Sequence, residues 1–234
     1  MDIKDLRQSL LYSEELKIEL RYRDDKEIFK WFLASLLFGG RITETIAKNT
    51  YRVFATYGLL NPRTILRAGW QFLVDPIMRE GGYVRYDGRK STQILTDCDK
   101  LITQYKGSLT RLHDLAKDER DLEQRLLDFY GVGNVTANIF LRELRPYWKK
   151  ADPEPLVVVK ELARKCGVPL DQYNRKTLAF ARIEAGLIRS RRKIEALMEH
   201  AGQGSNPSTG RIPGLLGQRH PRATNHLHGK TSRR

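Results

Sequence analysis

The chain has 234 residues, and its 42 Lys and Arg against 28 Asp and Glu give a formal net charge of +14. Such a basic balance favours a polyanionic partner, nucleic acid before an acidic membrane surface, with a merely solubilising surface as the plainer alternative. The two cysteines are too few for an iron–sulfur cluster or a four-cysteine zinc site. No apolar stretch approaches the roughly 20 residues of a bilayer span, and no signal peptide is evident, so we expect an intracellular protein without membrane contact.

Apolar residues recur at helical spacing along most of the chain, which predicts an all-α fold. Glycine, proline and capping residues separate the predicted helices. In chain order, the first helices cover 6–11, 28–38 ending at Gly39-Gly40, 43–57 opened by Thr43, a segment starting at Pro62, and 90–106 closed by Gly107. Trp31 and Trp70 lie on apolar faces, and we expect both in the core.

The second half continues the helical pattern. Predicted helices cover 122–129, 134–144, 156–166 and one long basic stretch at 176–200, although Val157-Val158-Val159 alone could form a strand. From residue 202 to 234 the chain is rich in Gly, Pro, Ser, Arg and His, with six Lys or Arg and no acid. This composition predicts a disordered basic tail, which either attracts phosphates or is an inert extension.

A short glycine-containing turn, Gly131-Val132-Gly133, joins two of the predicted helices. A connection this tight needs residues that accept unusual backbone angles and carry no Cβ, and Val132 is expected to fill the apolar gap between the helices. The amides of Gly133, Asn134 and Val135 would then start the next helix unpaired, with the helix dipole behind them. Such a helix start suits a backbone phosphate, although a plain helix-turn-helix corner shares the pattern.

The segment 126–138, Leu-Leu-Asp-Phe-Tyr-Gly-Val-Gly-Asn-Val-Thr-Ala-Asn, resembles the helix-hairpin-helix of the endonuclease III superfamily of base-excision DNA glycosylases. The stretches 32–37, 45–50 and 86–95 resemble that family in order and spacing, and the resemblance covers roughly residues 28–200. It implies two helical lobes flanking a DNA-binding cleft. Residues 1–27 would pack on the C-terminal lobe, 28–135 would form the central lobe, 136–201 the C-terminal lobe and 202–234 the tail.

The resemblance also implies a ligand set at the hairpin. A structural K⁺ or Na⁺ would bind the backbone carbonyls of Leu127, Phe129 and Val132 and bridge to a DNA phosphate. Thr136 would belong to the DNA-binding hairpin. No other cofactor is expected, since the family's cysteine cluster is absent.

The chain departs from the family at the position of the catalytic lysine. Bifunctional members carry a nucleophilic Lys where this chain has Val135, and an isopropyl group is no nucleophile. The resemblance therefore argues against Schiff-base lyase chemistry. Active members also use a carboxylate further along the chain, and the matching window holds Asp152 and Glu154. One of the two would activate water, unless both are ordinary turn acids.

Several cations are candidates for phosphate contacts. Lys48, Arg89 and Lys90 lie at predicted helix starts or loops, and Arg41 follows Gly40, where many members carry a Gln that fills the space of a flipped base. Each could instead be a solvated surface charge. The leading hypothesis is a monomeric, monofunctional DNA glycosylase acting on double-stranded DNA in the nucleoid or nucleus. A catalytically inactive hairpin DNA-binding protein and an RNA-associated basic protein are the alternatives.

Overall fold

A computed structural model describes residues 3–203 of the chain, and this range is built from helices, without strands. The all-α prediction is confirmed for these residues. The helices are α1 (Ile3–Arg7), α2 (Tyr12–Glu15), α3 (Asp25–Phe38), α4 (Glu44–Thr56), α5 (Pro62–Phe72), a π-helical segment (Leu73–Met78), α6 (Arg79–Gly81), α7 (Asp87–Tyr105), α8 (Leu109–Leu115), α9 (Glu119–Leu127), α10 (Asn134–Leu144), α11 (Val157–Lys165), a 3₁₀ turn (Leu170–Gln172), α12 (Leu178–Arg189) and α13 (Arg191–Gln203).

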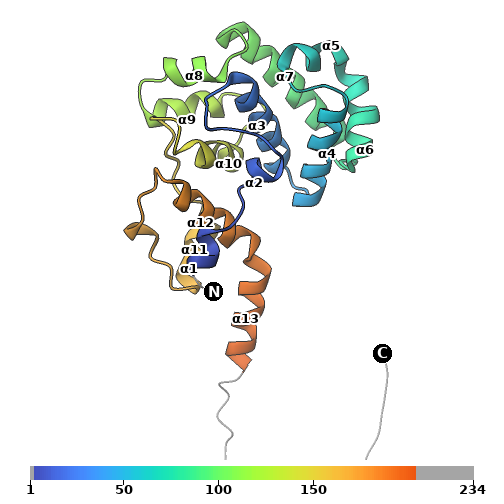
Figure 1. Cartoon of the computed structure of the whole chain (residues 1–234). Helices are drawn as coiled ribbons and strands as arrows, with labels where there is room; N and C mark the ends of the chain where they lie inside the picture. Colours follow the sequence, from blue (N-terminus) through green and yellow to red (C-terminus); the bar gives the residue numbers. More distant parts are fainter. Residues whose placement is uncertain (1–2, 204–234) are drawn as a thin grey trace, which may run out of the picture.

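Two hydrophobic cores divide the helices into two lobes. The larger lobe holds α2 to α10, drawn from blue through green to yellow in Figure 1, around the central helix α3. The smaller lobe lies beneath it and combines α1 with α11, α12 and α13. Burial of both apolar cores is the main source of stability for such an arrangement.

Helix α10 belongs to the larger core, which differs from the lobe boundary expected at residue 135. Phe140, Leu141 and Leu144 are buried there, and Trp31 Nε1 in α3 donates a hydrogen bond to Phe140 O at 3.0 Å. The N-terminal segment is also divided, since Leu6 packs in the smaller core while residues 11–20 pack in the larger. The chain thus leaves the larger core after Ala151, because the apolar face of α10 continues that core.

Most predicted helix ends match the structure. Thr43 Oγ1 accepts a hydrogen bond from Ile46 N at 3.3 Å, Pro62 occupies the first turn of α5, and Gly107 has a φ of 81°. Within residues 3–203, no helix combines the length and the apolar character that crossing a membrane requires.

Three predictions of local structure were wrong. Trp70 is 45% exposed because its indole nitrogen donates to Gly88 O and Thr92 Oγ1 at the surface. The first helix ends at Arg7. The long basic helix is split at Ser190, which caps α12, as expected of a residue type that favours helix ends. Residues 204–234, most of the predicted tail, lie outside the described residues.

Candidate nucleic-acid interface

The hairpin between α9 and α10 is fixed to the larger core by two apolar side chains. Phe129 is buried and its ring lies 5.4 Å from that of Phe32 and 6.1 Å from that of Tyr105. Val132 is 6% exposed and belongs to the same core, as predicted. These two buried side chains anchor the turn to the larger core and leave its backbone at the surface.

The two hairpin glycines have different reasons to be glycine. Neither has a positive φ, so the prediction that both supply unusual backbone angles was wrong. A Cβ on Gly131 would lie 2.6 Å from Asp97 Oδ2, so close packing requires this glycine. A Cβ on Gly133 would meet no atom within 4 Å, and its φ of −103° suits any residue. The fold does not need Gly133, but its small size keeps the start of α10 open.

Asp97 supports the hairpin from below and was missed by the sequence reading. Its carboxylate is fully buried in α7 and accepts a hydrogen bond from Gly131 N at 3.1 Å. Burial raises the pKa of Asp97 to about 6, although the amides of Gly131 and Tyr130 oppose the shift. An acid at helical spacing from Lys90, on the apolar side of the predicted helix, was the available signal.

A hollow of about 550 Å³, here called the hairpin pocket, opens at the start of α10. It brings together Arg41, from the loop between α3 and α4, with Arg89 and Lys90, from the first turn of α7. All three are among the cations that the sequence marked as candidates for phosphate contacts. No side chain of the described residues caps the amides at Asn134 and beyond, since Gly133 occupies the N-cap. Its lining consists of Gly39, Gly40, Arg41, Tyr83, Tyr86, Arg89, Lys90, Gln93, Gly131, Gly133, Asn134, Val135 and Thr136.

Lys90 is a buried cation in this pocket, with 6% of its surface exposed. Its Nζ donates a hydrogen bond to Leu36 O at 2.9 Å, at the end of α3. Burial lowers the pKa of Lys90 to about 8; the charge of Asp97 opposes the shift and that of Arg89 adds to it. Burial makes the charged form of Lys90 unfavourable for folding. An anion bound in this pocket, which Arg41, Arg89 and the uncapped amides also line, would stabilise that charge.

A second hollow, here called the inter-lobe pocket, adjoins the first and has a volume of about 260 Å³. Val135 lines both hollows and is 49% exposed. The walls come from both lobes, and most are apolar or aromatic. They consist of Tyr12, Phe38, Ile42, Thr43, Glu44, Ala47, Val135, Ile139, Arg142, Leu156, Val158, Ile188 and Arg191.

The two acids expected to be catalytic lie in neither hollow. Asp152 Oδ1 accepts a hydrogen bond from Arg175 Nε at 3.0 Å and lies 3.4 Å from Arg145 Nε. Glu154 pairs with Lys160 and Arg175, which lower its pKa. Carboxylates held by cations in this way favour the turn-acid alternative that the sequence left open.

Two other predicted sites, Lys48 and the monovalent-cation site, already have partners within the protein. Lys48 forms ion pairs with Glu15 and Glu44 and does not line the hairpin pocket. Among the carbonyls predicted to hold a monovalent cation, Phe129 O already accepts a hydrogen bond from Val132 N at 3.1 Å. Beside it, the Lys100 ammonium binds Asp128 O at 2.6 Å and lies 5.1 Å from the Phe129 ring centre. Leu127 belongs to the last turn of α9.

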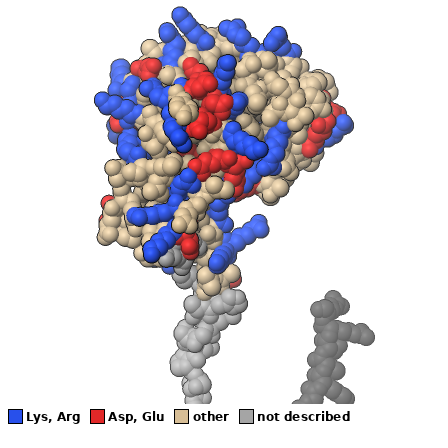
Figure 2. Space-filling view, in the orientation of Figure 1, with Lys and Arg blue, Asp and Glu red and all other residues tan. Residues whose placement is uncertain are grey.

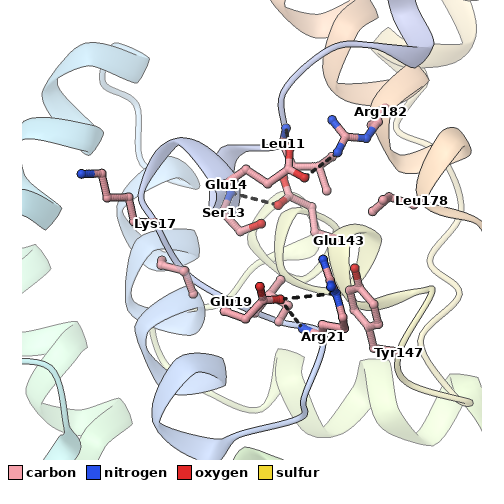
Figure 3. Close-up of a pocket in the computed structure, with 12 residues that line it drawn as sticks. Leu11, Ser13, Glu14, Lys17, Glu19, Arg21, Glu143, Tyr147, Leu178 and Arg182 are labelled. Carbon is pink, nitrogen blue, oxygen red and sulfur yellow. Dashed lines mark hydrogen bonds and ion pairs between the residues drawn. The ribbon is translucent and has the colours of Figure 1, made fainter.

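A third hollow, about 400 Å³ in volume, separates the 11–21 segment from α10 and α12 (Figure 3). Apart from Lys17, its charged side chains are engaged with one another or with the backbone. Glu143 accepts hydrogen bonds from Tyr12 N and Ser13 N at 3.1 and 3.0 Å, and Glu14 pairs with Arg182. Burial raises the pKa of Glu143. These contacts connect the N-terminal segment with α10 of the larger lobe and α12 of the smaller lobe.

Basic side chains project from both lobes, while acids gather near the middle of the face shown in Figure 2. On that face the cations form no single stripe, so the hairpin pocket is defined by geometry rather than by overall charge. Comparisons with protein-family models, with curated proteins and with solved structures gave no match. The resemblance to the endonuclease III superfamily thus rests on the hairpin residues and their spacing.

Proposed function

We propose that this protein binds duplex DNA, seating a backbone phosphate in the hairpin pocket and accepting an unstacked base in the inter-lobe pocket. The observation that carries the proposal is the open helix start at Gly133. Uncapped amides there face the same hollow as Arg41, Arg89 and Lys90. Amides at a helix start and three cations are the groups that bind phosphates in other proteins.

The shared wall at Val135 supports the second half of the proposal. An enzyme or a sensor that reads a base must remove it from the stack and hold it in a closed hollow. The inter-lobe pocket lies directly beyond the phosphate site, and its Tyr12 and Phe38 rings lie 5.1 Å apart. The two rings pack against each other and form one side of a mostly apolar hollow that can enclose a planar base.

Binding is tested by fluorescence anisotropy with labelled duplexes that are intact or contain one unpaired base, over a range of salt. We expect the logarithm of affinity to fall linearly with the logarithm of salt, and the unpaired base to bind more tightly. Equal affinity for intact duplexes and for duplexes with an unpaired base would contradict the proposal that the inter-lobe pocket accepts a base. Tighter binding to RNA of the same sequence would instead favour the RNA-associated alternative.

Base release is a second candidate function, and one observation favours it. Glu44, although paired with Lys48, places a carboxylate in the inter-lobe pocket, whereas Asp152 and Glu154 do not line this pocket. In this step the carboxylate takes a proton from water, the oxygen bonds to C1′, and the base leaves with the electrons of the C1′–N bond. Duplexes carrying uracil, thymine opposite guanine, 8-oxoguanine, alkylated purines and oxidised pyrimidines, treated with hot alkali, reveal abasic sites.

The carboxylate variants separate the catalytic hypotheses. If sites form, Glu44→Gln should abolish them while Asp152→Asn and Glu154→Gln retain them. If Asp152→Asn or Glu154→Gln abolishes the abasic product while DNA binding stays normal, the catalytic carboxylate is the residue replaced, and not Glu44. Duplex binding without abasic product across the panel would leave a hairpin DNA-binding protein without base release.

A further inference from the structure

The inter-lobe pocket contains a cation, Arg142, with one buried nitrogen that lacks a hydrogen-bonding partner among the described residues. Arg142 is 2% exposed, and its Nε is buried and unbonded among the described residues. The side chain projects from the face of α10 that carries Val135 and Ile139, both of which line the same pocket. Its guanidinium carbon lies 5.3 Å from the centre of the Tyr12 ring. A buried guanidinium of this kind gains most from an acceptor brought in by a ligand.

An acceptor group lies in the same pocket. Glu44 Oε2 accepts a hydrogen bond from the Tyr12 hydroxyl at 3.0 Å, and its other oxygen pairs with Lys48. A carboxylate has about four lone-pair sites, so Glu44 retains capacity for an N–H donor of a ligand. Tyr12 thus has a donor, Arg142, beside its ring and an acceptor, Glu44, at its hydroxyl end.

The size of the pocket fits a planar ring. An apolar cavity of about 150 Å³ is enough to admit benzene, and this pocket has a volume of about 260 Å³. Ile42 and Ile139 provide apolar walls, so a flat heterocycle can be enclosed while its edge meets the polar pair.

We propose that the inter-lobe pocket selects lactam bases, in which a ring carbonyl lies beside a ring N–H, with Arg142 donating to the carbonyl and Glu44 accepting from the N–H. This specificity rests on the proposed function of the pocket as the base site. Uracil, thymine, hypoxanthine and guanine-type bases have such an edge. Adenine has no ring carbonyl, and cytosine joined through N1 has its carbonyl beside a ring nitrogen without hydrogen. Neither base therefore offers a carbonyl and a neighbouring ring N–H to the pair of Arg142 and Glu44.

The test uses free bases and no DNA, so its outcome is independent of duplex binding at the hairpin. Equilibrium dialysis of the full chain against radiolabelled hypoxanthine, uracil, adenine and cytosine, each methylated at its glycosidic nitrogen so that only the edge exposed in a nucleotide remains, measures retention of each. We expect hypoxanthine and uracil to be retained at least tenfold better than adenine and cytosine. Arg142→Met, which keeps an apolar stem beside Tyr12, should bring the four bases to within about twofold of one another, a loss of roughly 1 kcal/mol of discrimination.

Two further variants keep the test decisive. Arg120→Met, on the exposed surface of α9, is the matched control and should retain the native preference. Ile42→Trp should block the hollow and lower retention of every base, which tests the site even if Arg142→Met fails to fold. Three results would overturn the proposal: no retention of any base by the native chain, equal retention of all four, or hypoxanthine binding that survives Ile42→Trp.

Discussion

Replacing Lys90 by Met tests whether a buried cation is maintained for DNA rather than for the fold. Methionine retains the apolar stem of lysine and removes the ammonium, which donates to Leu36 O at 2.9 Å. We expect the variant to be at least as stable as the native chain at pH 7 and to bind duplex DNA more weakly. Stability and DNA affinity are expected to change in opposite directions, because the buried charge destabilises the fold but attracts a phosphate.

The magnitude follows from the pKa of Lys90, which burial lowers from 10.5 to about 8. A shift of about 2.5 units corresponds to about 3 kcal/mol of unfavourable ionisation at pH 7. The variant leaves the Leu36 carbonyl unbonded, which costs about 1–3 kcal/mol. The difference predicts a variant that is unchanged or up to about 2 kcal/mol more stable at pH 7.

The pH dependence has a definite sign. A depressed lysine pKa gives stability that is complete above pH 10.5 and is lost as the pH falls through 8. Between pH 7 and 9.5 the native chain should therefore gain about 2 kcal/mol of unfolding free energy relative to Lys90→Met. Urea unfolding at the two pH values measures this gain.

DNA binding supplies the second half of the test. Loss of one phosphate contact should lower the slope of log affinity against log salt by about 1. Lys165→Met, an exposed lysine of the smaller lobe, is the matched control and should change the slope less. A variant that is less stable at pH 7 but binds DNA normally would show that Lys90 serves the fold, and the reasoning would be refuted.

Three other substitutions probe the supporting groups. Burial raises the pKa of Asp97 to about 6, so the native chain should lose about 3 kcal/mol of stability as pH rises from about 4 through 6. Asp97→Asn should flatten this part of the pH profile of stability, measured by urea unfolding. An unchanged profile in the variant would contradict this prediction. Gly39→Ala places a Cβ 1.9 Å from Thr136 Oγ1 and should lower stability by about 1–3 kcal/mol, as measured by thermal unfolding, whereas unaltered stability would show that the hairpin helix shifts freely. Val135→Lys puts an amine on the wall shared by both hollows, so borohydride should trap a covalent adduct with abasic DNA; no adduct would mean that the sugar does not reach this wall.

The sequence predicted most of the helices well, because helical periodicity is a local pattern, and three of the four cations proposed for phosphate contacts line one pocket. Helical periodicity placed α3, α4 and α10, and Arg41, Arg89 and Lys90 do share one pocket. Two features depended on tertiary contacts that the sequence does not specify. Asp97 supports Gly131 from another helix, and Trp70 is drawn to the surface by Gly88 and Thr92.

The candidate acids show the same limit. Asp152 and Glu154 matched a family spacing, yet Arg175, 23 residues after Asp152, pairs with both. No local pattern distinguishes Glu44 in the sequence. The fold places it in the inter-lobe pocket, where the Tyr12 hydroxyl of the N-terminal segment donates a hydrogen bond to it. Pairing partners from distant segments thus decide which carboxylate faces a ligand.

The most direct test of DNA binding through the hairpin pocket is the affinity of Gly133→Ser for duplex DNA. Serine is a favoured N-cap whose hydroxyl accepts from the amides that follow, so it should preserve or slightly raise stability while occupying the phosphate site. A serine Cβ meets no atom within 4 Å. We predict at least tenfold weaker duplex binding at unchanged thermal stability and unchanged net charge. Native affinity in a folded Gly133→Ser variant would contradict the account.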